Sequence, residues 1–142
     1  MISLTRSAAR YISKLSNKLR RKMDTLSSRK EFSGSQGRTL HFLLAQTDAV
    51  FQKDIEEEYS IRPSTATELL KQMEKSGLIR REPTSYDSRL KQIVLTPKAL
   101  TYRQQVVDDL TGLEEMLTRD IPEEDLQVFF RVIEKMMDNL AE

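Results

Sequence analysis

A short charged segment in the second half of the chain carries side chains suited to binding a polyanion. Asp87, Arg89 and Lys91 lie close together, and the apolar run Gln92–Leu95 follows directly. Guanidinium and ammonium groups on a loop can contact phosphates, and a nearby carboxylate can hold an arginine in one geometry. A second set of polar residues precedes this segment: Arg62, Ser64, Thr65, Thr67, Glu68 and Lys71. Hydroxyl groups of this kind can reach base edges or phosphates.

The second set lies at the start of a predicted helix. Pro63 suits the first helical position, where its missing N–H costs nothing, and Gly77 provides the C-terminal stop. The apolar stripe between them consists of Ala66, Leu69, Leu70 and Met73. Two short strands, 78–81 and 92–95, are predicted next, and the turn-rich segment between them indicates a hairpin.

Apolar periodicity predicts further helices before this region. The stripe from Leu4 to Leu26 predicts a long first helix, and Ser33 with Gln36 forms a capping-box pattern that opens a second helix. We expect Thr47–Asp48 to cap a short third helix, with Phe51 facing the core.

Two more helices are predicted after the hairpin. Thr96 and Pro97 open one that runs to Leu117, and Gly112 is expected to bend it. Pro122 starts the last helix, which carries acidic residues in its first turn and a strong apolar stripe. One thin domain cannot cover both terminal stripes, so we expect a homodimer formed by the two ends of the chain.

Composition excludes several classes of function. The chain of 142 residues has no Cys and one His, His41, which leaves no thiolate or His-rich metal site. We find no nucleotide-binding glycine motif and no paired nucleophile and base, so we expect neither an enzyme nor a cofactor. No apolar run has the length of a membrane helix, and the N-terminal segment lacks the apolar core of a secretory signal. A cytoplasmic protein without membrane contact is therefore expected.

The net charge of +1 conceals an uneven distribution. Residues 1–31 hold nine Lys and Arg against two Asp and Glu, and residues 62–103 hold nine against four. Residues 104–142 hold three basic residues against eleven acidic ones. The two basic blocks favour a polyanionic partner, although solvated helix faces would give the same counts.

The order of these elements predicts a mainly α fold with a small β-hairpin wing, which is a winged helix-turn-helix. The chain resembles the multiple-antibiotic-resistance-regulator (MarR) family of bacterial transcription factors. Asp87-Ser88-Arg89 followed by Leu95-Thr96 is similar to the D-x-R and L-T wing signature of that family. The segments Gln52–Ile55 and Gln72–Ile79 also match the family's pattern.

The resemblance implies a homodimer that binds double-stranded DNA, most simply as a repressor of a pseudo-palindromic site. Residues 33–96 would form the DNA-binding region of a single MarR-type chain, 1–142, and residues 1–30 and 97–142 would dimerise. In that arrangement Arg89 enters the minor groove, Asp87 holds it in place, and Ser88 and Lys91 lie beside it.

The resemblance also allows a small-molecule effector, whose identity the sequence leaves unknown. A pocket for it would fall near aromatic and basic residues, for which the candidates are Arg10, Tyr11, Arg38, His41 and Tyr102. These side chains are equally consistent with ordinary packing, and a half-buried position on a helix is the simpler expectation for His41.

Several alternatives remain open at this stage. Glu68 either reads a cytosine or pairs with Lys71 or Lys75 on the helix surface, and we favour the ion pair. Ser64 and Thr65 are also ordinary residues for the start of a helix. The winged helix could instead be a protein–protein module, or could bind nucleic acid through charge alone.

Overall fold

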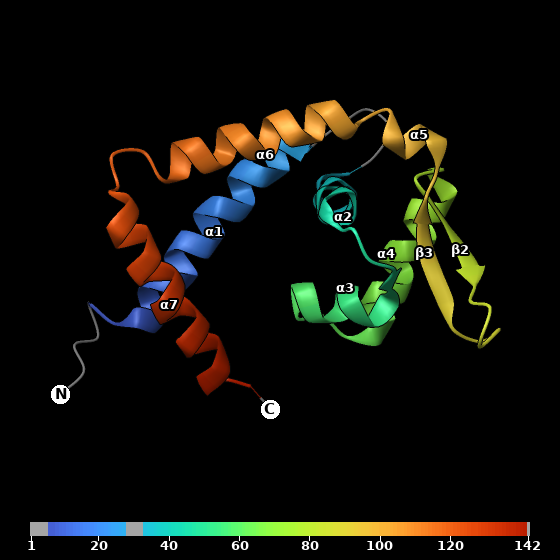
Figure 1. Cartoon of the computed structure of the whole chain (residues 1–142), viewed down its shortest axis with the longest axis horizontal. Helices are drawn as coiled ribbons and strands as arrows, with labels where there is room; N and C mark the ends of the chain where they lie inside the picture. Colours follow the sequence, from blue (N-terminus) through green and yellow to red (C-terminus); the bar gives the residue numbers. More distant parts are fainter. Residues whose placement is uncertain (1–5, 28–32, 142) are drawn as a thin grey trace. The chain divides into compact units, whose positions relative to one another are not determined.

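The computed structural model describes residues 6–27 and 33–141, which form a mainly helical fold with one small antiparallel sheet (Figure 1). The elements in chain order are α1 (Ala8–Ser27), α2 (Gly34–Ala45), β1 (Val50–Phe51), α3 (Gln52–Tyr59), α4 (Pro63–Lys75), β2 (Ile79–Pro83), β3 (Lys91–Leu95), α5 (Pro97–Leu100), α6 (Arg103–Leu117) and α7 (Glu123–Asn139). The predicted fold class is confirmed. Leu4, where the apolar stripe of the predicted first helix starts, lies outside the described residues. None of the described helices is long and apolar enough to cross a membrane.

The chain divides into two compact units at residue 109. The first unit contains α1 to α5, the sheet and the start of α6. The second contains the rest of α6 and α7.

Helix α2 begins at the predicted cap. The Ser33 hydroxyl accepts a hydrogen bond from the backbone N–H of Gln36, at 3.3 Å. The Gln36 side chain bonds to α4 and the residue after it, because its amide donates to Gln72 Oε1 at 3.5 Å and accepts from Ser76 Oγ at 3.0 Å. The buried Gln36 therefore ties α2 to α4 through these two bonds.

The predicted start of the third helix was wrong. Val50 and Phe51 form strand β1, which pairs with Ile93 and Gln92 of β3. Helix α3 begins only at Gln52, where the Asp54 carboxylate accepts from the Phe51 N–H at 2.8 Å. A two-residue strand has no periodicity of its own, so pairing with a distant strand decided its conformation.

The boundaries of α4 agree with the prediction. Pro63 occupies its first turn, and the chain leaves the helix through Ser76 and Gly77. Gly77 has φ +76°, a left-handed conformation that glycine adopts without a Cβ clash. The turn between α3 and α4 uses Ser60 at φ +51°, where glycine would be less strained.

The sheet has three strands in the order β1-β3-β2, so β3 is central. Strands β2 and β3 form the predicted hairpin, with Ile79 opposite Leu95 and Pro83 opposite Lys91. We call the β2–β3 hairpin the wing and residues 84–90 the wing tip. The wing extends away from the helices of the first unit (Figure 1).

The single helix predicted from Thr96 to Leu117 is instead two helices, α5 and α6, separated at Thr101–Tyr102. Thr96 caps α5 as expected, since its hydroxyl accepts from the Ala99 N–H at 3.2 Å. The Thr101 side chain then donates to the Lys98 carbonyl at 2.6 Å, and competes there with the helical ladder. Gly112 lies within the uninterrupted helix α6.

The hydrophobic core of the first unit lies where α2, α3 and α4 meet the sheet. Leu40, Ile55 and Leu70 are fully buried, one from each helix, and Ile79 and Ile93 cover them from β2 and β3. Burying a side chain of this size contributes about 1.5–3 kcal/mol. We call this unit without α1 the head; its core packs α4 against the base of the wing.

Helix α7 begins after Pro122, as predicted, with Glu123, Glu124 and Asp125 in its first turn. No residue of α7 is buried, although Phe129 and Phe130 stack edge to face at 5.6 Å. Its large apolar side chains remain 40% or more exposed at several positions, including Phe129, Phe130 and Met137.

Candidate nucleic-acid interface

The two faces of α4 differ sharply in exposure. Ala66, Leu70 and Met73 are buried in the core, so the opposite face points to solvent. Five of the residues predicted to bind DNA lie in this exposed part of α4 or just before it: Arg62, Ser64, Thr65, Glu68 and Lys71. The helix also presents its N-terminal backbone N–H groups there, which favour an anion.

Thr67 was predicted as a DNA-binding residue, but its hydroxyl is engaged inside the head. The hydroxyl donates to the Pro63 carbonyl at 2.9 Å and accepts from Gln52 Nε2, also at 2.9 Å. The bond from Gln52 holds the first turn of α4 against α3, and the bond to Pro63 lies within α4 itself. The side chain is only partly exposed.

Glu68 has an amide partner in place of the expected lysine. Its Oε1 accepts from Gln72 Nε2 at 3.4 Å, one helical turn away. No ion pair between Glu68 and either Lys71 or Lys75 is present in the described part of the chain. The Glu68 side chain is therefore left exposed on the face that carries Lys71.

Hydrogen bonds close the wing tip into a rigid loop. The Thr84 hydroxyl donates to the Asp87 carbonyl at 2.7 Å and accepts from the Asp87 N–H at 3.0 Å. The backbone of Leu90 bonds to both of these residues, donating to the Asp87 carbonyl and accepting from the Thr84 N–H. A loop ordered in this way loses little conformational freedom when it binds.

Asp87 also contacts Arg89 in the way that the resemblance implied. Its Oδ1 accepts from the Arg89 backbone N–H at 2.9 Å and lies 3.5 Å from Arg89 Nε. The Arg89 side chain is 92% exposed, so it is positioned at its base and free to reach outward. Ser88 and Lys91 are exposed on either side of it.

Sequence reasoning missed three residues of this region. Gln52 and Arg81 are joined by a hydrogen bond of 3.2 Å between Gln52 Oε1 and Arg81 Nη2, across 29 positions of sequence. Tyr86, which is 75% exposed, adds an aromatic ring to the wing tip. Gln52 lay in a segment that matched the family's pattern, but no local signal pointed to its partner.

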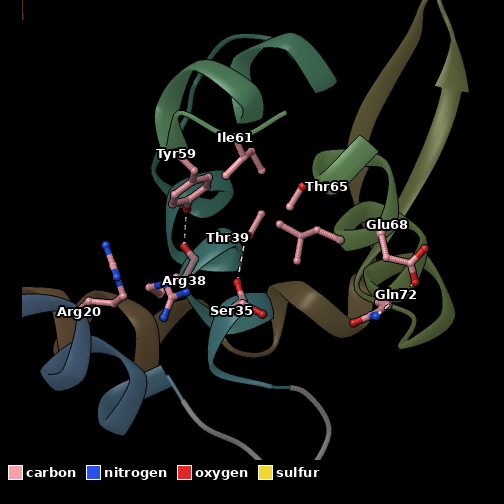
Figure 2. A pocket seen from close by; sticks show the side chains of 10 residues that line it. Arg20, Ser35, Arg38, Thr39, Tyr59, Ile61, Thr65, Glu68 and Gln72 are labelled. Carbon is pink, nitrogen blue, oxygen red and sulfur yellow. Dashed lines mark hydrogen bonds between the residues drawn. The ribbon is translucent and has the colours of Figure 1, made fainter. Parts of the chain in front are cut away.

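A pocket of about 510 Å³ lies behind α4, between that helix and α1, α2 and α3 (Figure 2). It is lined by Arg20, Ser35, Arg38, Thr39, Tyr59, Ile61, Thr65, Glu68, Leu69 and Gln72. Figure 2 shows Arg20 and Arg38 at one end and Glu68 and Gln72 at the other. The pocket therefore has a cationic end near α1, and its other end is lined in part by Thr65 and Glu68 of the exposed face of α4.

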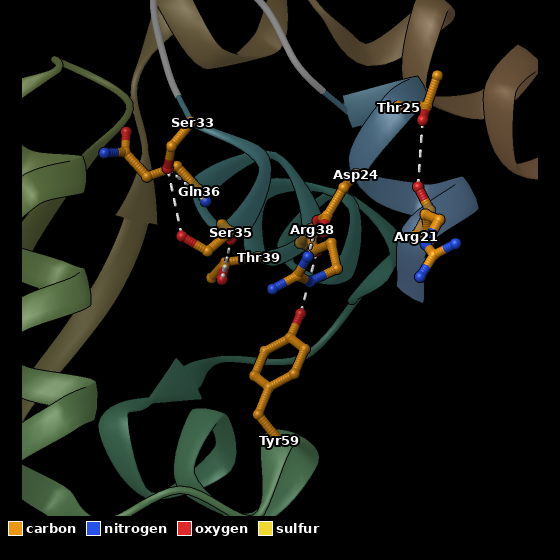
Figure 3. Close-up of polar contacts among 9 residues, drawn as sticks. All are labelled: Arg21, Asp24, Thr25, Ser33, Ser35, Gln36, Arg38, Thr39 and Tyr59. Atoms are coloured by element: carbon orange, nitrogen blue, oxygen red, sulfur yellow. Dashed lines mark hydrogen bonds and ion pairs between the residues drawn. The ribbon is translucent and has the colours of Figure 1, made fainter. Parts of the chain in front are cut away.

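One wall of the pocket connects three helices through Arg38 (Figure 3). The Arg38 guanidinium pairs with the Asp24 carboxylate of α1, and the Arg38 carbonyl accepts from the Tyr59 hydroxyl of α3 at 3.0 Å. Burial raises the pKa of Tyr59 to about 12, so its hydroxyl stays protonated and keeps donating at neutral pH.

Of the five residues suggested for an effector pocket, only Arg38 lines this one. His41 is 4% exposed, so it is more deeply buried in α2 than the half-buried position expected. Within residues 6–27 and 33–141, no cluster of acidic residues and His could hold a metal ion.

Comparisons with known proteins agree with this geometry. A family model described as MarR family matches residues 31–90. The transcription regulator MarR from Oenococcus oeni PSU-1 is 26% identical, with a TM-score of 0.79, and the match covers 93% of this chain and 99% of that one. MepR from S. aureus, in the structure of its complex with DNA, is 25% identical to this chain, with a TM-score of 0.80. The match covers 95% of this chain and 99% of that one.

A third structure, the PcaV transcriptional regulator from Streptomyces coelicolor in complex with its natural ligand, shares the fold. It is 17% identical, with a TM-score of 0.78 and coverage of 99% of both chains. A comparison with curated proteins finds no match. The family model covers α2 to β2 and the wing tip but not β3, and the solved structures extend the likeness over nearly the whole chain. Residues 31–90 therefore match the MarR family, and nearly the whole chain has the winged helix-turn-helix fold of MarR-type transcriptional regulators.

Proposed function

We propose that the protein is a homodimeric repressor that binds a pseudo-palindromic operator in double-stranded DNA. One observation carries the proposal: two exposed polar surfaces, the first turns of α4 and the wing tip, extend from one buried core. A DNA reader needs this combination, because a helix must enter the major groove while a second element reaches the flanking minor groove.

Helix α4 acts as the recognition helix in this proposal. Ser64 and Thr65 lie at its exposed N-terminus, where hydroxyls reach base edges and backbone N–H groups meet a phosphate. Lys71 and Arg62 supply phosphate contacts. Glu68 is the exception, because a carboxylate near DNA is repelled unless it accepts a hydrogen bond from cytosine N4.

The wing supplies the minor-groove contact. Arg89 enters the narrow groove of an A/T-rich flank, where the negative potential is strongest. Asp87 reduces the freedom that Arg89 would otherwise lose on binding, since it holds both the backbone and the base of the guanidinium. Ser88 and Lys91 add contacts to the neighbouring backbone.

Dimerisation is supported by apolar side chains that the described chain leaves uncovered. Helix α1 exposes Tyr11, Ile12 and Leu15, and α7 buries no residue. A second copy of the chain would cover such stripes, with residues 33–96 as the DNA-binding region and residues 1–30 and 97–142 as the dimerisation segments. Twofold symmetry then sets half-sites roughly 34–36 Å apart.

The pocket behind α4 is the proposed site of an effector that releases the operator. The two guanidinium groups of Arg20 and Arg38 suit an organic anion, and Ile61 and Leu69 suit an apolar body. Such a ligand would compete with Asp24 for Arg38 and press on the inner side of α4. Release requires that the ligand prefers the conformer that cannot bind DNA.

The DNA-binding proposal is tested by selecting duplexes from a random pool at near-physiological salt. We expect the parent protein to select an inverted repeat with A/T-rich flanks. Lys71→Ala should weaken binding to every sequence, and Arg89→Ala should also lose the preference for A/T flanks. Arg119→Ala removes an equivalent exposed charge outside the proposed interface, and should select the same sites as the parent.

Two other outcomes would replace the proposal. Equal retention of all duplexes by parent and variants, with steep salt dependence, would indicate binding by charge alone. No retention of any duplex would favour a protein–protein module.

The effector proposal is tested with a panel of aromatic carboxylates and their uncharged amides. We expect some carboxylates to raise the unfolding temperature and release a selected duplex, while the matched amides do neither. Arg20→Gln should reduce both effects. Equal responses to acids and amides, or none in either series, would contradict an anion site here.

A further inference from the structure

Gln52 is the first residue of α3, and its amide contacts three parts of the head. Its Nε2 lies 2.9 Å from Thr67 Oγ1, 3.1 Å from the Pro63 carbonyl and 3.2 Å from Glu56 Oε2. Its Oε1 accepts from Arg81 Nη2 at 3.2 Å. The donor end of the amide thus faces only acceptors, and the acceptor end faces a cation.

This arrangement requires an amide at position 52. A carboxylate would still accept from Arg81, but it would lose the donation to Thr67 and face the Glu56 carboxylate. An apolar side chain of similar size would leave Arg81 with Glu74 as its remaining polar partner, and the Thr67 hydroxyl with only the Pro63 carbonyl. Neither replacement reproduces both ends of the contact.

Arg81 carries the connection onward into the wing. It lies on β2, opposite Ile93 of β3, and its side chain is only 24% exposed. Its Nε lies 3.3 Å from Glu74 Oε1 near the C-terminus of α4. Gln52 and Glu74 therefore hold one guanidinium between them, and that guanidinium belongs to the strand that leads to the wing tip.

The same small network reaches both elements that are proposed to read DNA. Pro63 and Thr67 belong to the exposed first turns of α4, while Arg81 belongs to the wing. The Gln52 side chain is hydrogen-bonded both to the first turn of α4 and to Arg81. A change there would leave each element folded but remove a direct polar link between them.

We propose that Gln52 is a positioning residue that sets the spacing between the recognition helix and the wing through Arg81. It does not itself touch DNA. Because it fixes this spacing, the bases read in the major groove and the A/T flank read in the minor groove lie at one fixed separation. The inference rests on the proposed function for its DNA consequence, but the positioning itself can be measured without DNA.

The first experiment measures positioning in the free protein. The chain has no Cys, so Lys71→Cys and Ser88→Cys place two spin labels, one on α4 and one on the wing tip. Diluting labelled protein with unlabelled protein isolates distances within one chain. We expect a narrow distance distribution for the parent and a clearly broader or shifted one for Gln52→Leu. An unchanged distribution in the folded variant would overturn the inference.

Two further variants keep the test decisive if Gln52→Leu folds poorly. Gln52→Glu retains the Arg81 contact, and Thr67→Val removes the hydroxyl partner at similar volume, so each should broaden the distribution partially. Gln46→Leu is the matched control, because the Gln46 amide bonds only to Phe42 of its own helix, at 3.0 Å. Equal broadening by the control would mean that general destabilisation is responsible.

The second experiment repeats the duplex selection with the unlabelled proteins. Gln52→Leu should bind about tenfold more weakly and select sites in which the distance from the core motif to the A/T flank varies. If Gln52→Leu binds more weakly but still selects the parent's single distance between the core motif and the A/T flank, the inference is contradicted. If the parent itself selects no motif, the proposed function fails, while the spin-label result still decides whether Gln52 positions the two elements.

Discussion

The head and helix α7 differ in the solvent exposure of their apolar side chains. In the head, Leu40, Ile55 and Leu70 have no exposed surface, and polar groups such as Thr67 and Gln52 bond across helices. In α7 no residue is buried, and Phe129 and Phe130 are each more than 40% exposed. Both regions carry a strong apolar stripe, but only the first is covered by its own chain.

In the proposed homodimer, this difference separates the part of the function that belongs to one copy from the part that needs two. A covered core can hold α4 and the wing in place within a single chain. An uncovered stripe of aromatic and aliphatic residues is instead typical of an interface. Stability of the head should therefore be independent of protein concentration, whereas the arrangement of two heads on DNA should not.

The largest effect is expected from placing charge on the α7 stripe. Replacing Phe129 and Phe130 together by Glu should abolish the dimer, because burying two carboxylates in an apolar interface is strongly unfavourable. Operator affinity should fall by about 10²–10⁴-fold as one of two linked half-site contacts is lost. Sedimentation and duplex titration measure both; a dimer that persists in the variant would place the interface elsewhere.

The core of the head is tested by Leu70→Ala. Removing a fully buried leucine should lower the free energy of unfolding by about 2–5 kcal/mol. Chemical denaturation measures this decrease in two backgrounds, the parent and the variant with Glu at positions 129 and 130. Leu70→Ala should lower the free energy of unfolding by the same amount in both. A loss that depends on protein concentration would show that head and interface do not fold independently.

The wing contact should have an intermediate effect. Arg89→Ala should reduce operator affinity by about 1–3 kcal/mol without changing thermal stability, because the side chain is 92% exposed. Titration with duplexes that differ only in their flanks measures it. Asp87→Ala should produce a smaller loss of affinity; a loss as large as that of Arg89→Ala would mean that the wing tip itself has lost its structure.

Tyr59 makes the junction of α2 and α3 sensitive to alkali. Its pKa is raised by burial from 10.0 to about 12, so the neutral phenol is favoured in the folded state. The associated stability is fully present below about pH 10 and is lost as the pH rises toward about 12. Across this pH range the free energy of unfolding should fall less steeply in Tyr59→Phe than in the parent. An equal decline in both proteins would assign the effect to other groups.

The smallest effect is expected at the turn between α3 and α4. Ser60 has φ +51°, so Ser60→Gly should relieve strain and stabilise the head by about 0.5–1 kcal/mol. Ala at the same position should not stabilise it, which provides the control. Denaturant midpoints measure the difference, and a destabilised glycine variant would indicate that the Ser60 side chain contributes more than its backbone strain costs.

Local chemistry predicted much of this fold correctly. Pro63 and Gly77 bracket α4, Ser33 and Thr96 cap their helices, and the turn composition between two apolar runs identified the wing. The Asp87–Arg89 contact spans two residues, so a sequence motif could carry it. In each case the signal and the structure that it specifies lie within a few neighbouring positions.

Features that depend on distant partners were not predictable in this way. Strand β1 exists because Val50 meets Ile93, and the Gln52–Arg81 bond joins residues 29 positions apart. Glu68 was expected to pair with a lysine on its own helix, but its nearest polar partner is Gln72. At the break between α5 and α6 the Thr101 hydroxyl bonds to the Lys98 carbonyl, a contact that the apolar periodicity of the sequence does not reveal.

The most direct measurement varies the separation of two half-sites in a selected operator. We expect two chains to bind each duplex, and we expect that inserting half a helical turn, about five base pairs, between the half-sites nearly abolishes binding. Inserting a full turn should recover part of it only if the dimer can span the longer distance. Undiminished binding at every separation, with one chain per half-site, would contradict a dimer that places two heads on one face of the DNA.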